Sequence, residues 1–227
     1  MSDYQEFRVV YELTSTILCF ILVWFMAKPY RYTKQARYVG LPLAFGLLGA
    51  SYFLSAIAYA QLSFFPDDLF WVQLAVRAFA FVFLASTYRF PKKISETTST
   101  SRLIWSVVST LIALTIITLI MALIINPQFN FSNYKAASSY VRIFNIICLT
   151  YVIINVLRNH MAKPESSTLL IPLGYILLAI SQYSLIVWAL DSSMSAWWGA
   201  LSLRWGGLAI FLYVAYVTFF GSQKKGK

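Results

Sequence analysis

The sequence predicts an all-α membrane protein with seven transmembrane helices. Hydrophobic residues make up 59% of the 227 residues and charged residues only 11%. Soluble domains are nearer half apolar and a quarter charged. The apolar residues also come in long blocks, and clusters of basic residues follow every second block. These observations together predict the number of helices and their orientation.

Each apolar block is long enough to cross a bilayer. A run of about 18 or more apolar residues with few charges is typical of a membrane-spanning helix. Seven such spans fit the chain, and we number them in order as 8–27, 40–62, 69–88, 103–125, 138–157, 168–190 and 196–220. The segments between them are short, so we expect a single membrane domain over 1–227.

The basic residues predict how the spans are oriented. Clusters of Lys and Arg follow spans 1, 3, 5 and 7: Lys28, Arg31, Lys34 and Arg37; Arg89, Lys92, Lys93 and Arg102; Arg158 and Lys163; Lys224, Lys225 and Lys227. Lys and Arg collect on the cytoplasmic side of membrane proteins. We therefore expect the N-terminus outside, the C-terminus inside, and the cytoplasmic membrane as the location. The net charge of +10 is explained by topology, and we expect no nucleic acid as a partner.

An internal repeat links the two halves of the chain. The tetrapeptide MAKP follows span 1 and again span 5. In the same order, LPLAFGLLGAS in span 2 matches IPLGYILLAIS in span 6, and WVQLAVR in span 3 matches WGALSLR in span 7. The last match aligns Arg77 with Arg204. We expect two parallel three-helix repeats, 8–88 and 138–220, joined by a linker helix over 103–125.

This 3+1+3 plan resembles those of SWEET-type sugar transporters and microbial rhodopsins, over the whole chain but without a shared motif. A rhodopsin needs a lysine in span 7 for its retinal Schiff base, and 196–220 contains none. SWEET-type transporters carry prolines within the first helix of each unit, whereas Pro42 and Pro172 open the second. A proline at a helix start favours initiation and is not a hinge. No functional residue carries over from either family.

Polar side chains in the outer half of the spans form the candidate site. Ionisable groups inside a bilayer are costly unless they are paired or hydrated. The candidates are Glu12, Gln73, Arg77, Arg142, Asn145 and Arg204, with Asp67, Asp68 and Asp191 expected in the loops just above. The spacing places Gln73 on the same helix face as Arg77, and Asn145 on the same face as Arg142.

Two interpretations of this polar layer are open. It forms either an outward-facing cavity, in which arginines bind a small anion such as a carboxylate or phosphate, or a structural network that ties helices together. In the second case some arginines simply extend to the outer head groups. Aromatic residues that could wall a cavity are Tyr11, Tyr52, Trp71, Tyr140, Tyr183, Trp198 and Trp205.

We expect no catalytic residue, metal site or cofactor. His160 is the single histidine, which argues against bis-histidine haem or a histidine-rich metal site. Cys19 and Cys148 lie in apolar spans and are expected to pack as small apolar side chains. The predicted function is a non-catalytic, receptor-like ligand-binding module, or an auxiliary subunit of a membrane complex, with a protein partner or a second copy.

The alternative function is a small-solute carrier of SWEET-like plan. Parallel repeats would place its substrate near the membrane midplane, between the two units. The polar side chains that could line such a site are Ser51, Asn145, Asn155, Ser181 and Gln182.

Overall fold

The computed structural model describes residues 2–33, 40–60, 66–89, 134–162 and 169–220. These ranges form α1 (Ser2–Thr33), α2 (Gly40–Tyr59), α3 (Pro66–Arg89), α5 (Tyr134–Ala162), α6 (Leu170–Asp191) and α7 (Met194–Phe220). The helices contain apolar stretches of 20 to 26 residues, each long enough to cross a membrane. The described part of the chain is therefore all-helical, as predicted, and holds six of the seven predicted spans. The span predicted over 103–125 lies outside the described residues.

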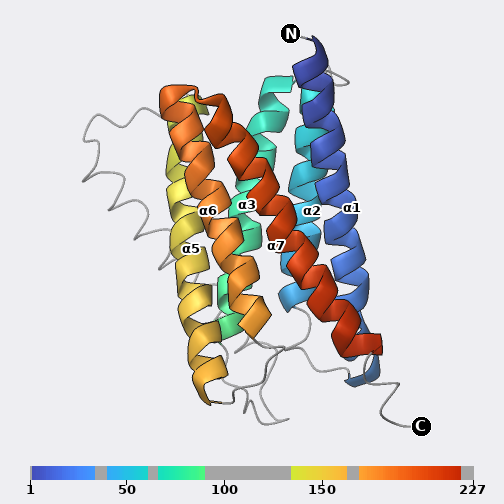
Figure 1. Ribbon diagram of the computed structural model, residues 1–227. Coiled ribbons are helices and arrows are strands. Elements are labelled where there is room, and N and C mark those ends of the chain that lie inside the picture. The colour runs from blue at the N-terminus through green and yellow to red at the C-terminus, as the bar shows by residue number, and fades with distance from the viewer. Residues whose placement is uncertain (1, 34–39, 61–65, 90–133, 163–168, 221–227) are drawn as a thin grey trace.

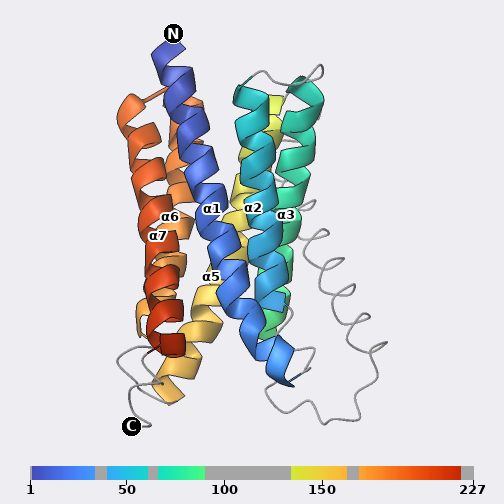
Figure 2. The ribbon, with the colours of Figure 1, turned by 90° about the vertical axis from the view of Figure 1, so that its right-hand side faces the viewer.

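The described helices form a ring in chain order. α1 packs on α2, α2 on α3, α3 on α5, α5 on α6, α6 on α7, and α7 on α1. Figures 1 and 2 show α1, α3, α5 and α7 running away from the end of the bundle that holds the N-terminus, with α2 and α6 running back. We call that end the N-terminal end. Two parallel three-helix units around a two-fold axis would produce this arrangement, but the duplication itself stays a prediction.

The helix boundaries differ from the expected spans at both ends of the bundle: α1 is longer by six residues at each end, and α5 by four and five residues. Asp67 and Asp68, expected in a loop, lie in the first turn of α3, and Asp191, also expected in a loop, ends α6. Ser192 follows with a positive φ of 54°, which caps α6 and turns the chain directly into α7. The connection between α6 and α7 is therefore very short.

The inner face of the ring is apolar over much of its length. Cys19 and Leu22 are fully buried, whereas Ile17 and Phe20 on the same helix are exposed by 59% and 49%. Apolar residues on opposite faces of one helix are typical of a helix that packs on one side and meets lipid on the other. The buried cluster contains Phe45, Leu48, Phe81, Leu149, Val152, Leu178 and Leu208. Both cysteines lie within it, in keeping with a packing role.

α6 and α7 approach each other closely because glycine removes the side chain at two facing positions. A Cβ atom on Gly207 would lie 2.9 Å from the carbonyl oxygen of Gly174, and one on Gly174 would lie 2.8 Å from the ring of Phe211. Near the same interface, the Ser181 hydroxyl donates to the carbonyl oxygen of Ala200 at 2.7 Å. Small residues allow such close helix packing in membranes.

Candidate functional site

All the predicted site residues line one small cavity in the half of the bundle nearest the N-terminal end. The side chains that meet there are Glu12 from α1, Gln73 and Arg77 from α3, Arg142 and Asn145 from α5, and Arg204 from α7. α2 adds Ser55 and Tyr59, and α6 adds Leu185. We call this space, with a volume of about 20 Å³, the inner cavity. It is large enough for a water molecule.

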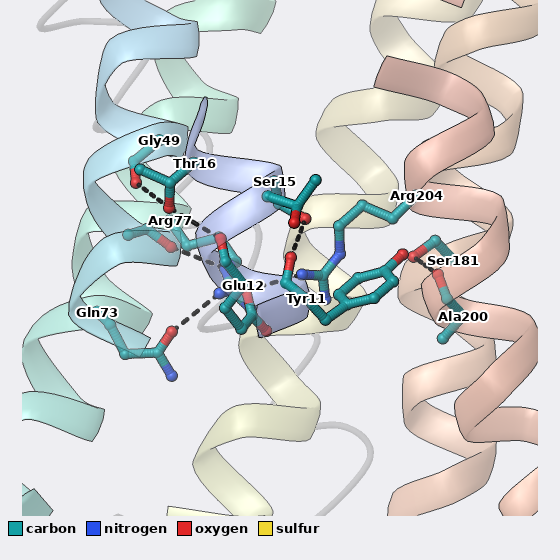
Figure 3. A network of polar contacts seen from close by, with 12 residues as sticks. Tyr11, Glu12, Ser15, Thr16, Gly49, Gln73, Arg77, Ser181, Ala200 and Arg204 are labelled. Atoms are coloured by element: carbon teal, nitrogen blue, oxygen red, sulfur yellow. Dashed lines mark hydrogen bonds and ion pairs between the residues drawn. The ribbon is translucent and has the colours of Figure 1, made fainter. Parts of the chain in front are cut away.

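A buried ion pair joins the first and last helices of the ring. Arg204 Nη1 donates to Glu12 Oε2 at 2.9 Å, with the side chains exposed by only 2% and 5% (Figure 3). The guanidinium of Arg204 also lies 4.6 Å from the ring of Tyr52 and 5.6 Å from that of Tyr11. Glu12 is thus already paired with one arginine of the layer.

Tyr11 also takes part in the contact between α1 and α7, and it is buried. Its ring stacks on Trp205 at 4.5 Å with an interplanar angle of 7°. Stacked aromatic pairs add to the stabilisation from burial. The contact between α1 and α7 therefore combines a buried charge pair with a stacked ring pair.

Arg77 is held by neutral partners. Its Nε donates to the Ser51 hydroxyl at 2.9 Å. Its Nη2 donates to Gln73 Oε1 at 3.0 Å (Figure 3). The bond to Gln73 confirms that the two residues share a helix face. Arg77 is 7% exposed, and within the described ranges no carboxylate lies within ion-pair distance of it. Its positive charge is therefore not neutralised by a described side chain.

Asn145 faces the inner cavity with its hydrogen-bonding capacity unused. The residue is fully buried, and neither Nδ2 nor Oδ1 has a hydrogen-bond partner among the described residues. Nearly all buried polar groups in proteins are hydrogen-bonded. A buried amide that lines a polar cavity and lacks a protein partner points to an occupant of the cavity, either water or a ligand.

Arg142 connects the inner cavity to a larger one. Its Nη1 donates to the carbonyl oxygen of Leu185 at 2.6 Å, which leaves the charge without an acidic partner in the described part of the chain. The outer cavity has a volume of about 640 Å³. Its lining consists of Arg8, Tyr59, Phe70, Trp71, Tyr134, Ser138, Arg142, Trp188, Ala189 and Ser192. The two cavities share Arg8, Tyr59, Tyr134 and Arg142, so they adjoin.

Arg8 is a lining residue that the sequence analysis missed. Its guanidinium lies 3.7 Å from the centre of the Tyr59 ring and 5.4 Å from that of Trp188. Because Arg8 lies four residues before Glu12, helical spacing places both on one face. That spacing was the available signal, although it does not identify Tyr59 as the partner.

The aromatic wall differs largely from the expected one. Of the seven aromatic residues expected there, Trp71 lines the outer cavity. The residues that line neither cavity are Tyr11, Tyr52, Tyr140, Tyr183, Trp198 and Trp205. The prediction for these six was wrong because period alone does not identify the inward face of a helix that is apolar all round. The other rings in the lining of the outer cavity belong to Tyr59, Phe70, Tyr134 and Trp188.

The charge balance of the two cavities favours anions. Among the described lining residues, Arg8, Arg77, Arg142 and Arg204 oppose a single carboxylate, that of Glu12. Guanidinium groups bind carboxylates and phosphates through paired hydrogen bonds. In the same ranges, no three His, Cys, Asp or Glu side chains are grouped to hold a metal ion. Comparisons with models of known protein families, with curated proteins and with solved structures find no match.

Proposed function

We propose that the protein is a seven-helix membrane protein that binds a small anion from outside, as a receptor-like module or an auxiliary subunit and not as an enzyme. The excess of arginine around the joined cavities carries this proposal. Glu12 is paired with Arg204, so Arg77 and Arg142 hold positive charge that the described lining does not balance. A bound anion would supply the missing negative charge.

Burial makes this missing charge important. An ion pair is strongly disturbed when one partner is removed inside a protein, because the remaining charge is left uncompensated. Arg77 is in that situation when the cavity holds no anion, since Ser51 and Gln73 offer it only neutral acceptors. An anionic oxygen in the inner cavity would accept hydrogen bonds from Arg77 and from the Asn145 amide. Both groups line that cavity.

The positive-inside pattern supports an opening toward the outside. Arg158 and Lys28 lie at the opposite end of the bundle from the outer cavity, as expected if that end faces the cytoplasm. A signal would pass from the cavities to a partner protein or to a second copy of the chain.

The apolar core supports a binding module over the alternative carrier. Leu22, Phe45 and Phe81 are buried in the cluster that lies between the inner cavity and the far end of the bundle. Two of the five polar residues expected for a carrier site bond backbone carbonyl oxygens instead. Ser181 bonds the Ala200 carbonyl oxygen, and Asn155 bonds that of Tyr151. A carrier would need this apolar segment to open.

Anion binding to the purified protein tests the proposal. The protein in lipid nanodiscs is titrated with sodium propionate and with sodium phosphate, and binding is followed by calorimetry. We expect one of these anions to bind and Arg77→Gln to weaken binding by about tenfold or more, as expected when a charged hydrogen bond is lost. Arg158→Gln is the matched control, since Arg158 is exposed and far from the cavities. Equal binding by wild type and Arg77→Gln, or no binding of either anion, would refute the proposal.

A further inference from the structure

We infer that the ligand is an aromatic carboxylate, with its carboxylate at the junction of the two cavities and its ring in the outer cavity. This inference rests on the proposed function and narrows it from anions in general to one chemical class. Three features of the described residues support it: the unequal size of the cavities, the ring lining of the outer one, and the position of Arg142.

The cavity sizes argue against a bare inorganic anion. The inner cavity, at about 20 Å³, accepts little more than a water molecule or the tip of a ligand. The adjoining outer cavity measures about 640 Å³, within the range of small-molecule sites, about 300–1,000 Å³. A ligand that fills both spaces has a small polar head and a larger body.

The outer cavity offers ring faces and ring edges to that body. Phe70 lies 5.1 Å from Tyr59 and 5.6 Å from Tyr134, measured between ring centres. Trp71 meets Tyr134 edge-on at 5.6 Å with an interplanar angle of 83°. Aromatic rings prefer such offset and edge-to-face contacts with other rings. The lining therefore favours a flat aromatic body over a flexible or highly polar one.

The head group is positioned by residues that belong to both cavities. Arg142 lines both, as does Tyr134, whose hydroxyl accepts a hydrogen bond from Gln73 Nε2 at 3.0 Å. The Oε1 atom of Gln73 in turn accepts a hydrogen bond from Arg77 Nη2. A carboxylate next to Arg142 would thus face Arg77 and Asn145 on the inner side while its ring remains among the aromatic residues.

Comparison of matched ligands tests the inference. We expect 3-phenylpropionate to bind about tenfold or more tightly than propionate, since burial of a phenyl ring is strongly favourable. We expect 3-phenylpropionamide, which has the ring but no charge, to bind at least about tenfold more weakly than 3-phenylpropionate. Equal affinities of propionate and 3-phenylpropionate would overturn the inference and leave the proposed function standing. If propionate, 3-phenylpropionate and phosphate all fail to bind, both the inference and the proposed function are refuted.

A variant of the outer cavity provides an independent check. Trp71→Ala should lower the affinity for 3-phenylpropionate by about fivefold or more, because the ligand ring loses an aromatic partner in the outer cavity. The affinity for propionate should stay unchanged, because propionate has no ring. Trp71 is 37% exposed, so its removal does not empty the core. Phe79→Ala is the control, since Phe79 lies on the same helix, is 45% exposed and lines neither cavity. Equal effects of the two substitutions on 3-phenylpropionate would contradict the assignment.

Discussion

Replacing Asn145 by leucine should make the protein more stable and at the same time unable to bind its anion. The side chain is fully buried, and both polar atoms of its amide lack a partner in the described protein. A buried polar group without a hydrogen bond costs about 1–3 kcal/mol. Leucine has the same number of non-hydrogen side-chain atoms and a similar branched shape, and Phe144, Cys148 and Leu149 are apolar buried neighbours in sequence.

The size of the gain follows from the cavity beside the amide. Its volume of about 20 Å³ admits a water molecule that could satisfy one amide atom, so we expect a gain of about 1–3 kcal/mol and not twice that value. For a chain of this length, the melting temperature should rise by about 2 to 12 °C. Thermal unfolding of the purified protein, followed by tryptophan fluorescence, measures the shift.

The control for this experiment lies on the same helix. Asn155 Nδ2 donates to the carbonyl oxygen of Tyr151 on the exposed side of α5, so Asn155→Leu should change stability by less than about 0.5 kcal/mol. A clear loss of stability in Asn145→Leu would show that the amide has structural partners and would refute the reasoning. Unchanged anion binding in a stable Asn145→Leu protein would show that the amide does not contact the ligand.

Three further predictions concern the frame around the site. Glu12→Gln should destabilise the protein by about 3–5 kcal/mol in thermal or denaturant unfolding, because it leaves Arg204 buried and unpaired. Replacement of both Glu12 and Arg204 by leucine should recover most of this loss, because no unpaired charge remains. Gly207→Ala should lower the melting temperature because its Cβ would meet the Gly174 carbonyl oxygen at 2.9 Å, whereas Gly199→Ala, with open space around it, should leave the temperature unchanged or raise it. A cysteine in place of the exposed Ser192 should react with a membrane-impermeant maleimide in intact cells, since we place the α6–α7 turn outside. Labelling that occurs only after lysis would show that the α6–α7 turn faces the cytoplasm and that the proposed topology is inverted. The native cysteines are buried, so they should not react.

The fold was largely predictable because membrane spans depend on local properties. Length and composition alone located the described helices, and Gly40 and Leu170 lie within two residues of the predicted starts of their spans. The meeting of Glu12 with Arg204 was harder to predict, since any of the layer's arginines could have been its partner. Their pairing depends on the closure of the ring between α1 and α7.

The details of the site depend on packing that no sequence period reveals. Gln73 and Arg77 could be paired from helical spacing, because both lie on one helix. Ser51 as a second acceptor for Arg77, and the Leu185 carbonyl oxygen as the acceptor for Arg142, come from neighbouring helices and depend on the relative rotation of those helices. Aromatic residues occur all round these helices, so composition did not distinguish the inward-facing Trp188 from the exposed Tyr183.

The ion pair between α1 and α7 has a consequence for biosynthesis. Glu12 and Arg204 are 192 residues apart in the chain, and chain synthesis at about 5–20 residues per second separates their appearance by about 10 to 40 s. During that interval the carboxylate enters the bilayer before its counter-charge has been made. A chain that stops before α7 lacks Arg204, the arginine that pairs with Glu12 in the closed ring, and leaves Glu12 with only the other arginines of the cavity as possible partners. Of the described helices, α7 is made after the others, and it supplies the charge partner of α1.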